Sequence, residues 1–121
     1  MQLHVSDKSN QPIYEQLYEQ ITAQIMAGEL PADFCLPSIR VVAKELGVSV
    51  ITVKKAWELL EWNGFIYTRA GKGCFVAAQS DAHWADKSRA LAEQKLAEQL
   101  PYYKSLQLSA EELIELIRKL Y

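Results

Sequence analysis

Few of the residues that build metal centres and disulfide frameworks are present in this chain. Its 121 residues include two cysteines and two histidines. Two cysteines are too few for a disulfide scaffold, and Cys35 and Cys74 are too far apart for a chelating pair. His4 and His83 lack partners at metal-ligand spacing, and we interpret both as surface residues. We therefore expect no metal site and no cofactor.

Catalytic and membrane signatures are absent as well. The sequence has no glycine-rich phosphate loop, no paired carboxylates with a plausible cleft and no Ser/His/Asp set, so no catalytic residues are expected. No apolar run approaches the ~20 residues of a transmembrane helix. Residues 1–12 lack the apolar core and cleavage pattern of a signal peptide. These absences predict a cytoplasmic protein that has no membrane partner and is not an enzyme.

An excess of positive charge is also missing. Basic residues number 13 and acidic residues 15, which gives a formal net charge of −2. Between residues 36 and 76 the balance is reversed: the cations are Arg40, Lys44, Lys54, Lys55, Arg69 and Lys72, and the acids are Glu45, Glu58 and Glu61. A locally cationic segment on a weakly acidic chain is compatible with DNA binding but does not demand it.

What the chain does contain is a helix-turn-helix pattern. Ser38, after Pro37, can cap a helix that ends at Gly47, and Ser49 can cap a second helix that ends near Asn63. The apolar residues recur at helical spacing, as Ile39, Val42, Ala43 and Leu46 in the first helix and Val53, Ala56, Trp57 and Leu60 in the second. In such a pair the second helix enters the major groove of DNA.

Two β-rich runs follow the second helix. Residues 65–68 and 74–76 flank the sequence Arg-Ala-Gly-Lys-Gly at residues 69–73. This pattern predicts a hairpin with a glycine-rich, cationic tip, which is a wing. Residues 36–76 are therefore predicted to form a winged helix-turn-helix.

A further helix is predicted before this segment. Pro12 suits the first turn of a helix, and an apolar stripe at helical spacing continues down to Gly28. The helix would pack under the helix-turn-helix as its third wall. We place Tyr14, Tyr18 and Trp57 in the core rather than on a stacking surface, because they fall at inward spacing.

The composition shifts after a short polar linker at residues 77–81. A long helix is predicted from Ala82 to about Leu106, and Pro101 is expected to kink it or to begin a new segment. Ser109 opens a capping box before a short amphipathic helix. Two helices cannot enclose a ligand cavity of the usual ~300 Å3 or more, so their apolar stripes need a partner.

The simplest partner for this tail is the same pair of helices from a second chain. The predicted dimer interface consists of Trp84, Leu91, Leu96, Leu100, Tyr103, Leu113 and Ile117. The monomeric alternative is a helical hairpin folded back on the winged helix. The predicted fold is mainly α with a small β-wing: a winged helix-turn-helix DNA-binding domain at residues 1–78, then a two-helix dimerisation tail at residues 79–121.

Short motifs at characteristic spacing run through residues 12–76. They are Pro12-Ile13-Tyr14, Gly28-Glu29-Leu30, Leu36-Pro37-Ser38 with Arg40, Gly47-Val48, Thr52-Val53, Gly64-Phe65, and Gly71-Lys72-Gly73 with Phe75-Val76. In this order they resemble the DNA-binding domain of the GntR family of bacterial transcription regulators. The tail is similar to the YtrA subfamily, which lacks large effector domains and dimerises through two helices. That resemblance implies a repressor, commonly of operons that encode ABC transporters.

The chain departs from that family at two places. Cys35 occupies the position before Leu36-Pro37-Ser38 where the family usually carries an arginine that grips DNA. Val50 and Ile51 begin the second helix of the pair, where the family often has polar residues. An apolar side chain there can meet a thymine methyl group. The alternative is that both residues pack on the first helix or merely lie exposed.

The cysteines leave two interpretations open. In winged helices a short strand before the second helix often pairs with the last wing strand, so Cys35 and Cys74 could be neighbours and form a redox switch. We favour two small, semi-buried hydrophobic residues in a reducing compartment.

The predicted DNA-contacting residues combine the motif and the resemblance. They are Ser38, Arg40, Ser49, Val50, Ile51, Thr52, Lys54, Lys55, Arg69, Gly71, Lys72 and Gly73. The resemblance implies that Arg40 and Lys54 reach phosphate or base. Ser49 and Thr52 would bond phosphate at a helix N-terminus, and the glycines would let the wing approach the minor groove.

The predicted partners are double-stranded DNA and a second copy of the chain, which would bind a palindromic operator together. The sequence does not identify a small-molecule effector. The alternative function is a winged-helix protein-interaction module without specific DNA binding. The apolar Val50-Ile51 pair, Cys35 and the acidic total charge favour that alternative.

Overall fold

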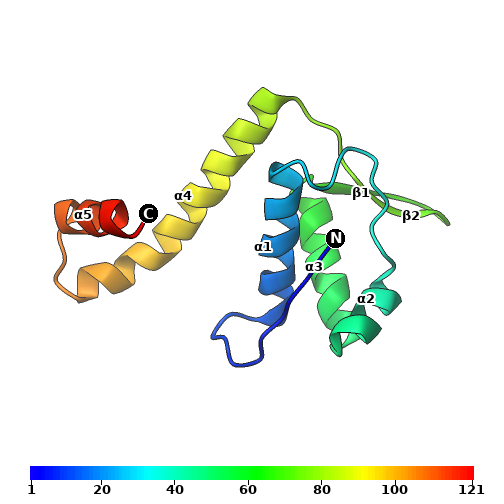
Figure 1. The fold of residues 1–121 in the computed structure, drawn as a ribbon, viewed down its shortest axis with the longest axis horizontal. Helices are drawn as coiled ribbons and strands as arrows, with labels where there is room; N and C mark the ends of the chain where they lie inside the picture. Colours follow the sequence, from blue (N-terminus) through cyan, green and yellow to red (C-terminus); the bar gives the residue numbers. More distant parts are fainter. The chain divides into compact units, whose positions relative to one another are not determined.

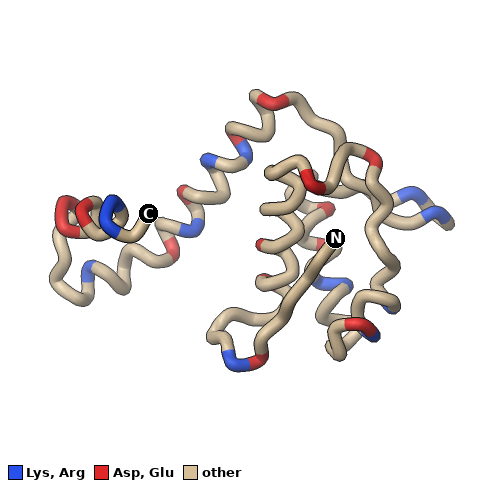
Figure 2. Tube along the Cα trace, in the orientation of Figure 1, with Lys and Arg blue, Asp and Glu red and all other residues tan.

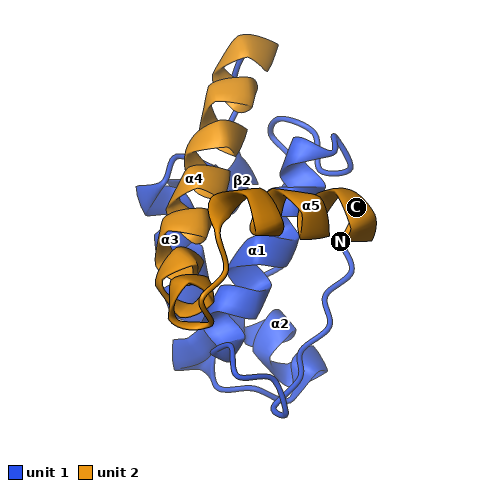
Figure 3. Cartoon of the chain, turned by 90° about the vertical axis from the view of Figure 1, so that its left-hand side faces the viewer, with its two compact units in different colours: residues 1–80 blue, residues 81–121 orange.

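The computed structural model describes residues 1–121 and contains five helices and one hairpin. The elements are α1 (Ile13–Met26), α2 (Ile39–Leu46), α3 (Val50–Trp62), β1 (Ile66–Arg69), β2 (Gly73–Val76), α4 (Asp81–Ser105) and α5 (Ala110–Leu120) (Figure 1). The chain divides into two compact units, Met1–Ser80 and Asp81–Tyr121, which Figure 3 shows in two colours. The predicted fold class, mainly helical with a small β-wing, is confirmed.

Local hydrogen bonds set the ends of α2 and α3 where the sequence predicts them. The Ser38 hydroxyl accepts the N–H of Val41 at 3.2 Å, and the Ser49 hydroxyl accepts the N–H of Thr52 at 3.1 Å. Gly47 ends α2 in the left-handed conformation, with φ of 67°, which costs glycine little because it has no Cβ. The tight turn between the two helices therefore follows from Gly47 and Ser49.

The core of the first unit lies between α1, α2 and α3. It contains Leu17, Ile21 and Ile25 from α1, Val42 and Ala43 from α2, and Val53, Ala56, Trp57 and Leu60 from α3, together with Phe65. Trp57 is buried as predicted, whereas Tyr14 and Tyr18 are only half-buried. Tyr18 meets the Phe65 ring edge-on, with 6.1 Å between centroids. The two tyrosines thus border the core and are not part of its interior.

The wing is an antiparallel pair with alternating faces. Ile66 and Val76 pair with each other and are buried against the core, and Tyr67 pairs with Phe75 on the other face. Cys35 bridges to Phe75 on the free side of β2. The segment before α2 therefore pairs with β2 through an isolated bridge, which connects the wing to the helix-turn-helix.

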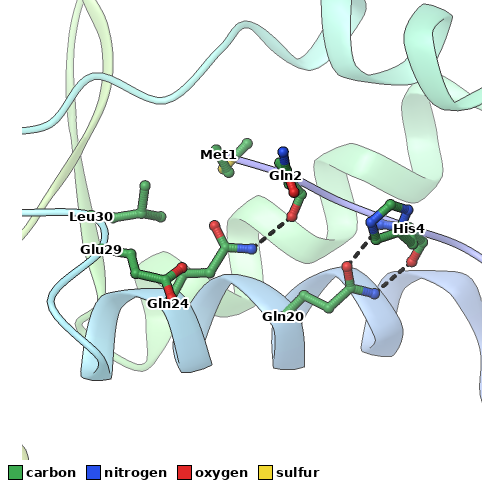
Figure 4. Close-up of a pocket in the computed structure, with 7 residues that line it drawn as sticks. All are labelled: Met1, Gln2, His4, Gln20, Gln24, Glu29 and Leu30. Carbon is green, nitrogen blue, oxygen red and sulfur yellow. Dashed lines mark hydrogen bonds between the residues drawn. The ribbon is translucent and has the colours of Figure 1, made fainter.

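The N-terminal residues form a strap along α1, which the sequence analysis did not anticipate. Gln16, Gln20 and Gln24 each bond the strap backbone through their side-chain amides, at Ser6, His4 and Gln2 respectively. Figure 4 shows the bonds of Gln20 and Gln24, beside a cavity of about 450 Å3. Four helical residues advance ~6 Å and two extended residues ~6.6 Å, so the two spacings match. The glutamines at every fourth residue of α1 were the sequence signal for this strap.

Replacing Gln16 by alanine is expected to lower the free energy of unfolding by about 2 kcal/mol. Its side chain is 8% exposed and makes three bonds, with the N–H and carbonyl of Ser6 and the carbonyl of Gln11. Urea unfolding measures the change. Gln24→Ala is the matched control, because the Gln24 amide makes one exposed bond, to Gln2. Equal losses in the two variants would contradict this account.

The second unit consists of α4 and α5. Ser109 and Glu112 form the predicted capping box, and the Ser109 N–H lowers the pKa of the Glu112 carboxyl. Pro101 lies inside α4 and does not begin a new segment. Pro101 and Ala97, whose carbonyl loses its helical partner, are both exposed, so water can satisfy that carbonyl. No residue of α4 or α5 is buried, and none of the five helices is long and apolar enough to cross a membrane.

Candidate nucleic-acid interface

The first turns of α3 present an apolar surface to solvent. Ile51 is 79% exposed and Val50 is 46% exposed. Of the alternatives that the sequence left open, packing on α1 is therefore wrong for Ile51. Contact with a thymine methyl group in the major groove stays a prediction for this exposed pair, beside the alternative that both residues merely lie exposed.

Two hydroxyls stand beside this apolar pair. Ser49 and Thr52 are joined by an Oγ–Oγ1 hydrogen bond of 2.8 Å, and Ser49 also accepts the N–H of Thr52. Whichever hydroxyl donates within the pair, the other retains its proton. That proton is available to a phosphate oxygen at the positive end of the α3 dipole.

The predicted cationic side chains of α2 and α3 differ in their interactions within the chain. Lys54 lies 3.9 Å from Glu58, with side chains 63% and 65% exposed. An exposed pair of this kind contributes at most about 1 kcal/mol, so phosphate can displace the carboxylate. Arg40 is exposed in the first turn of α2. Lys55, by contrast, is not simply solvated, because its ammonium lies 4.0 Å from the Tyr14 ring centroid. It joins α3 to α1.

The wing holds two cations at its tip, Arg69 at the end of β1 and Lys72 in the turn. The Arg69 guanidinium lies 5.7 Å from the centroid of the Tyr67 ring. That ring stacks on Phe75 at 5.5 Å and donates its hydroxyl to Asp33 at 2.5 Å. The hydrogen bond to Asp33 raises the pKa of Tyr67. Tyr67 was missed by sequence reasoning, although it lies two residues before Arg69 on the same face of β1.

The hairpin tip is glycine-rich for a geometric reason. Gly71 and Gly73 have φ of 74° and 114°, where a side chain would be strained. Lys72 lies exposed between them. Figure 2 shows basic residues at the tip of the β1–β2 hairpin. The predicted residues of α2, α3 and the wing thus belong to one unit, and all are exposed except Thr52, which is half-buried.

The two cysteines are neighbours that cannot form a disulfide with each other. The N–H of Leu36 donates to the carbonyl of Cys74, while Cys35 is opposite Phe75. Side chains one position apart in a ladder point to opposite faces. Cys35 Sγ accordingly lies 3.9 Å from where Gly73 would carry a Cβ, and Cys74 Sγ lies 3.5 Å from the Thr68 hydroxyl on the opposite face.

Mild oxidation is therefore expected to leave no bond between Cys35 and Cys74. The measurement is the intact mass of the monomeric chain after treatment with oxidised glutathione, followed by alkylation under denaturing conditions. A Cys35→Ser/Cys74→Ser variant supplies the thiol-free reference. A loss of two protons within one chain would contradict the assignment of the two thiols to opposite faces.

The predicted interface residues of the tail lie where a partner could reach them. Leu96, Leu100 and Ile117 are 50%, 37% and 52% exposed, and the other four are half-buried. Further apolar side chains are exposed but were not among the predicted residues: Tyr102, Leu106, Ile114, Leu116 and Leu120. Their helical spacing in α5 was the available signal. Much of the apolar surface of α4 and α5 is thus exposed.

Comparison with known proteins identifies the family of the first unit. The family described as "Bacterial regulatory proteins, gntR family" matches residues 13–76. The probable rhizopine catabolism regulatory protein MocR of Rhizobium meliloti is 44% identical over 66 residues, which are 54% of this chain and 13% of that protein. The chain therefore spans a small part of MocR.

Two relatives of similar size extend the likeness into the tail. The uncharacterised HTH-type transcriptional regulator YhcF of Bacillus subtilis is 31% identical over 111 residues, 92% of this chain and 91% of that protein. The HTH-type transcriptional repressor YtrA of the same bacterium is 27% identical over 94 residues, 78% of this chain and 72% of that protein.

Solved structures agree with these relatives. A transcriptional antiterminator from Listeria monocytogenes EGD-e superposes with a TM-score of 0.77 at 34% identity, over 98% of this chain and 89% of that one. YtrA from Sulfolobus acidocaldarius, a GntR-family transcription factor, gives 0.62 at 35% identity, over 78% and 97%. The DNA-binding domain of AraR, solved with its operator ORE1, gives 0.54 at 31% identity, over 64% and 94%. The chain belongs to the GntR family of bacterial transcription regulators, among the YtrA-like members with a short helical C-terminal region.

Proposed function

We propose that this protein is a repressor that binds a palindromic operator as a homodimer. The observation that carries the proposal is the exposed first half of α3 beside a wing with a cationic tip. Each α3 would enter the major groove of one half-site, and each wing would follow the adjacent minor groove. The AraR domain with its operator supports DNA as the partner, because that domain resembles residues of this first unit.

Phosphate contacts would supply most of the affinity. Arg40, Lys54, Arg69 and Lys72 are exposed cations on three elements of the first unit. With the hydroxyls of Ser49 and Thr52 they would give ~3–5 phosphate contacts per protomer, and hence a steep dependence on salt. In this proposal all twelve predicted residues contact DNA. Lys55 contributes least, because its ammonium already interacts with the Tyr14 ring.

Sequence discrimination would come from α3 and from the DNA shape. Ile51 is the most exposed apolar residue at the start of α3 and would meet a thymine methyl group. Lys54 would reach a guanine or a phosphate. Gly71 and Gly73 would let the backbone of the wing approach the minor groove closely.

The tail would make the dimer, with residues 1–78 as the DNA-binding domain and residues 79–121 as the dimerisation segment. Half-sites about 34–36 Å apart match one turn of DNA, and two copies related by a twofold axis match a palindrome. Occupancy of the operator would then block RNA polymerase. From the likeness to YtrA proteins we propose that the protein represses an operon that encodes an ABC transporter together with its own gene.

The test is fluorescence anisotropy on DNA from upstream of the protein's own gene, with a scrambled duplex as control, at two salt concentrations. Specific binding tighter than control by ~10^3 or more, with a steep salt slope, is the expected result. Absence of binding even at low salt would contradict the proposal. It would favour a protein-interaction module, for which the exposed Ile51 and the carboxylates of α3 would then be the starting point.

A further inference from the structure

A groove of about 500 Å3 lies between α3 and the wing, and the proposed DNA contacts leave most of it unused. It is lined by Ile39 of α2, by Lys54, Trp57, Glu58, Glu61 and Trp62 of α3, and by Thr68 and Cys74 of the wing. We call it the α3–wing groove. Its volume is within the range of small-molecule sites, which is ~300–1,000 Å3.

Trp62 is the unusual member of this groove. Its side chain is 87% exposed, although it ends a helix whose other tryptophan, Trp57, is 4% exposed. An exposed tryptophan indicates a binding surface better than a buried one does, because burying its large apolar area against a ligand is favourable. Two indoles from one helix therefore line the same groove, one of them with almost all its surface open to an occupant.

The charged groups of the groove are mostly carboxylates. Glu58 forms a largely exposed ion pair with Lys54, with 3.9 Å between Oε1 and Nζ. Glu61 accepts a hydrogen bond from the Thr68 hydroxyl across the groove, which holds the carboxylate in place without neutralising it. Both carboxylates lie on the helix that is proposed to enter DNA, where they would repel phosphate.

We propose that the α3–wing groove binds an organic cation with an aromatic or apolar body. Indole faces attract ammonium and guanidinium groups, with Trp the best of the aromatic rings. The Glu61 and Glu58 carboxylates add a Coulombic preference for positive charge and disfavour anions. The indole of Trp62 contacts both the cationic group and the apolar body of the ligand, and the Glu61 carboxylate pairs with the cationic group.

Such a ligand would compete with DNA, a consequence that rests on the proposed function. The groove lies between α3 and the hairpin, and both elements belong to the proposed DNA interface. An occupant would cover Lys54 and stand between the recognition helix and the wing. The tail needs no effector pocket of its own, because release from DNA would act within the first unit.

The binding test uses the full chain in isothermal titration calorimetry at neutral pH. The probe is 2-phenylethylammonium, with 2-phenylethanol as its uncharged near-isostere. The cation should bind with one site per chain and about tenfold or more tightly than the alcohol. Trp62→Ala and Glu61→Gln should each weaken the cation about tenfold, while the amide of Glu61→Gln can still accept from Thr68.

Glu45→Gln is the matched control, because Glu45 is an exposed carboxylate of α2 outside the groove. It should leave cation binding unchanged. Equal affinity for the two probes, no saturable binding, or cation binding that survives Trp62→Ala would each overturn the proposal. Circular dichroism confirms that the variants remain folded.

Competition is measured by operator anisotropy with and without saturating 2-phenylethylammonium. We expect at least a tenfold loss of DNA affinity for the unaltered chain, and a loss about tenfold smaller for Trp62→Ala at the same cation concentration. Unchanged DNA affinity in the presence of a bound cation would overturn the competitive role. Failure to bind any DNA would count against the proposed function alone, because the calorimetry decides the cation site without DNA.

Discussion

Reversing the charge of Arg40 and Lys54 together, as Arg40→Glu with Lys54→Glu, is expected to weaken operator binding by at least about a thousandfold. Each side chain is an exposed cation on an element of the proposed interface. Each lost phosphate contact reduces the salt slope by about 1, so four in a dimer reduce it by about 4. The measurement is the operator dissociation constant at several salt concentrations.

The fold should tolerate this double change. Arg40 and Lys54 are exposed, and Lys54→Glu exchanges a weak pair with Glu58 for a like-charge pair that costs about 0.5 kcal/mol. Lys8→Glu with Lys104→Glu is the charge-matched control, since both lysines are exposed outside the interface. DNA binding by the Arg40/Lys54 variant at the level of this control would show that the contact surface is wrong.

Polar substitutions on α5 are expected to prevent formation of the proposed dimer. Leu113→Asn with Ile117→Asn places two amides on the apolar face of a helix that has no buried residue within one chain. The proposed dimer would bury that face, and an unpaired buried amide costs about 1–3 kcal/mol. Sedimentation at micromolar concentration should then detect a single chain.

Loss of the dimer should weaken binding to a full palindrome at least about a hundredfold, because the second half-site no longer binds at high effective concentration. Binding to an isolated half-site should be unchanged. Glu111→Asn with Glu115→Asn is the matched control on the exposed polar face of α5. A Leu113/Ile117 variant that stays dimeric would remove α5 from the interface, whereas dissociation of the control would show that helix content, not the apolar face, was lost.

Several features were determined by the sequence because they depend on residues a few positions apart. The hydroxyls of Ser38 and Ser49 each cap a helix through an N–H three residues away. The spacing of Val53, Trp57 and Leu60 alone placed them on the buried face of α3. Helix periodicity, caps and turn glycines sufficed for the fold class, and the order of the motifs sufficed for the family.

Features made by residues far apart in sequence were decided only by the tertiary structure. His4 and Gln20 are 16 residues apart, and Tyr67 and Asp33 are 34 apart. No local pattern states which distant groups will meet, because that depends on how the helices pack. The two cysteines show the same limit. The order of the segments predicts that Cys35 and Cys74 lie close together. Only the register, with Cys35 opposite Phe75, shows that the two thiols point to opposite faces.

The candidate site divides along the same line. The sequence by itself determined which residues at the α2, α3 and wing termini are polar or cationic. The tertiary structure decided that Ile51 is exposed, that Tyr14 holds Lys55 and that Tyr67 holds Arg69. It also decided that Trp62 lines a groove with Glu61, since that groove exists only where α3 packs beside the hairpin. The chemistry of a side chain is given by its residue type, whereas the residues that surround it are set by the packing of the whole unit.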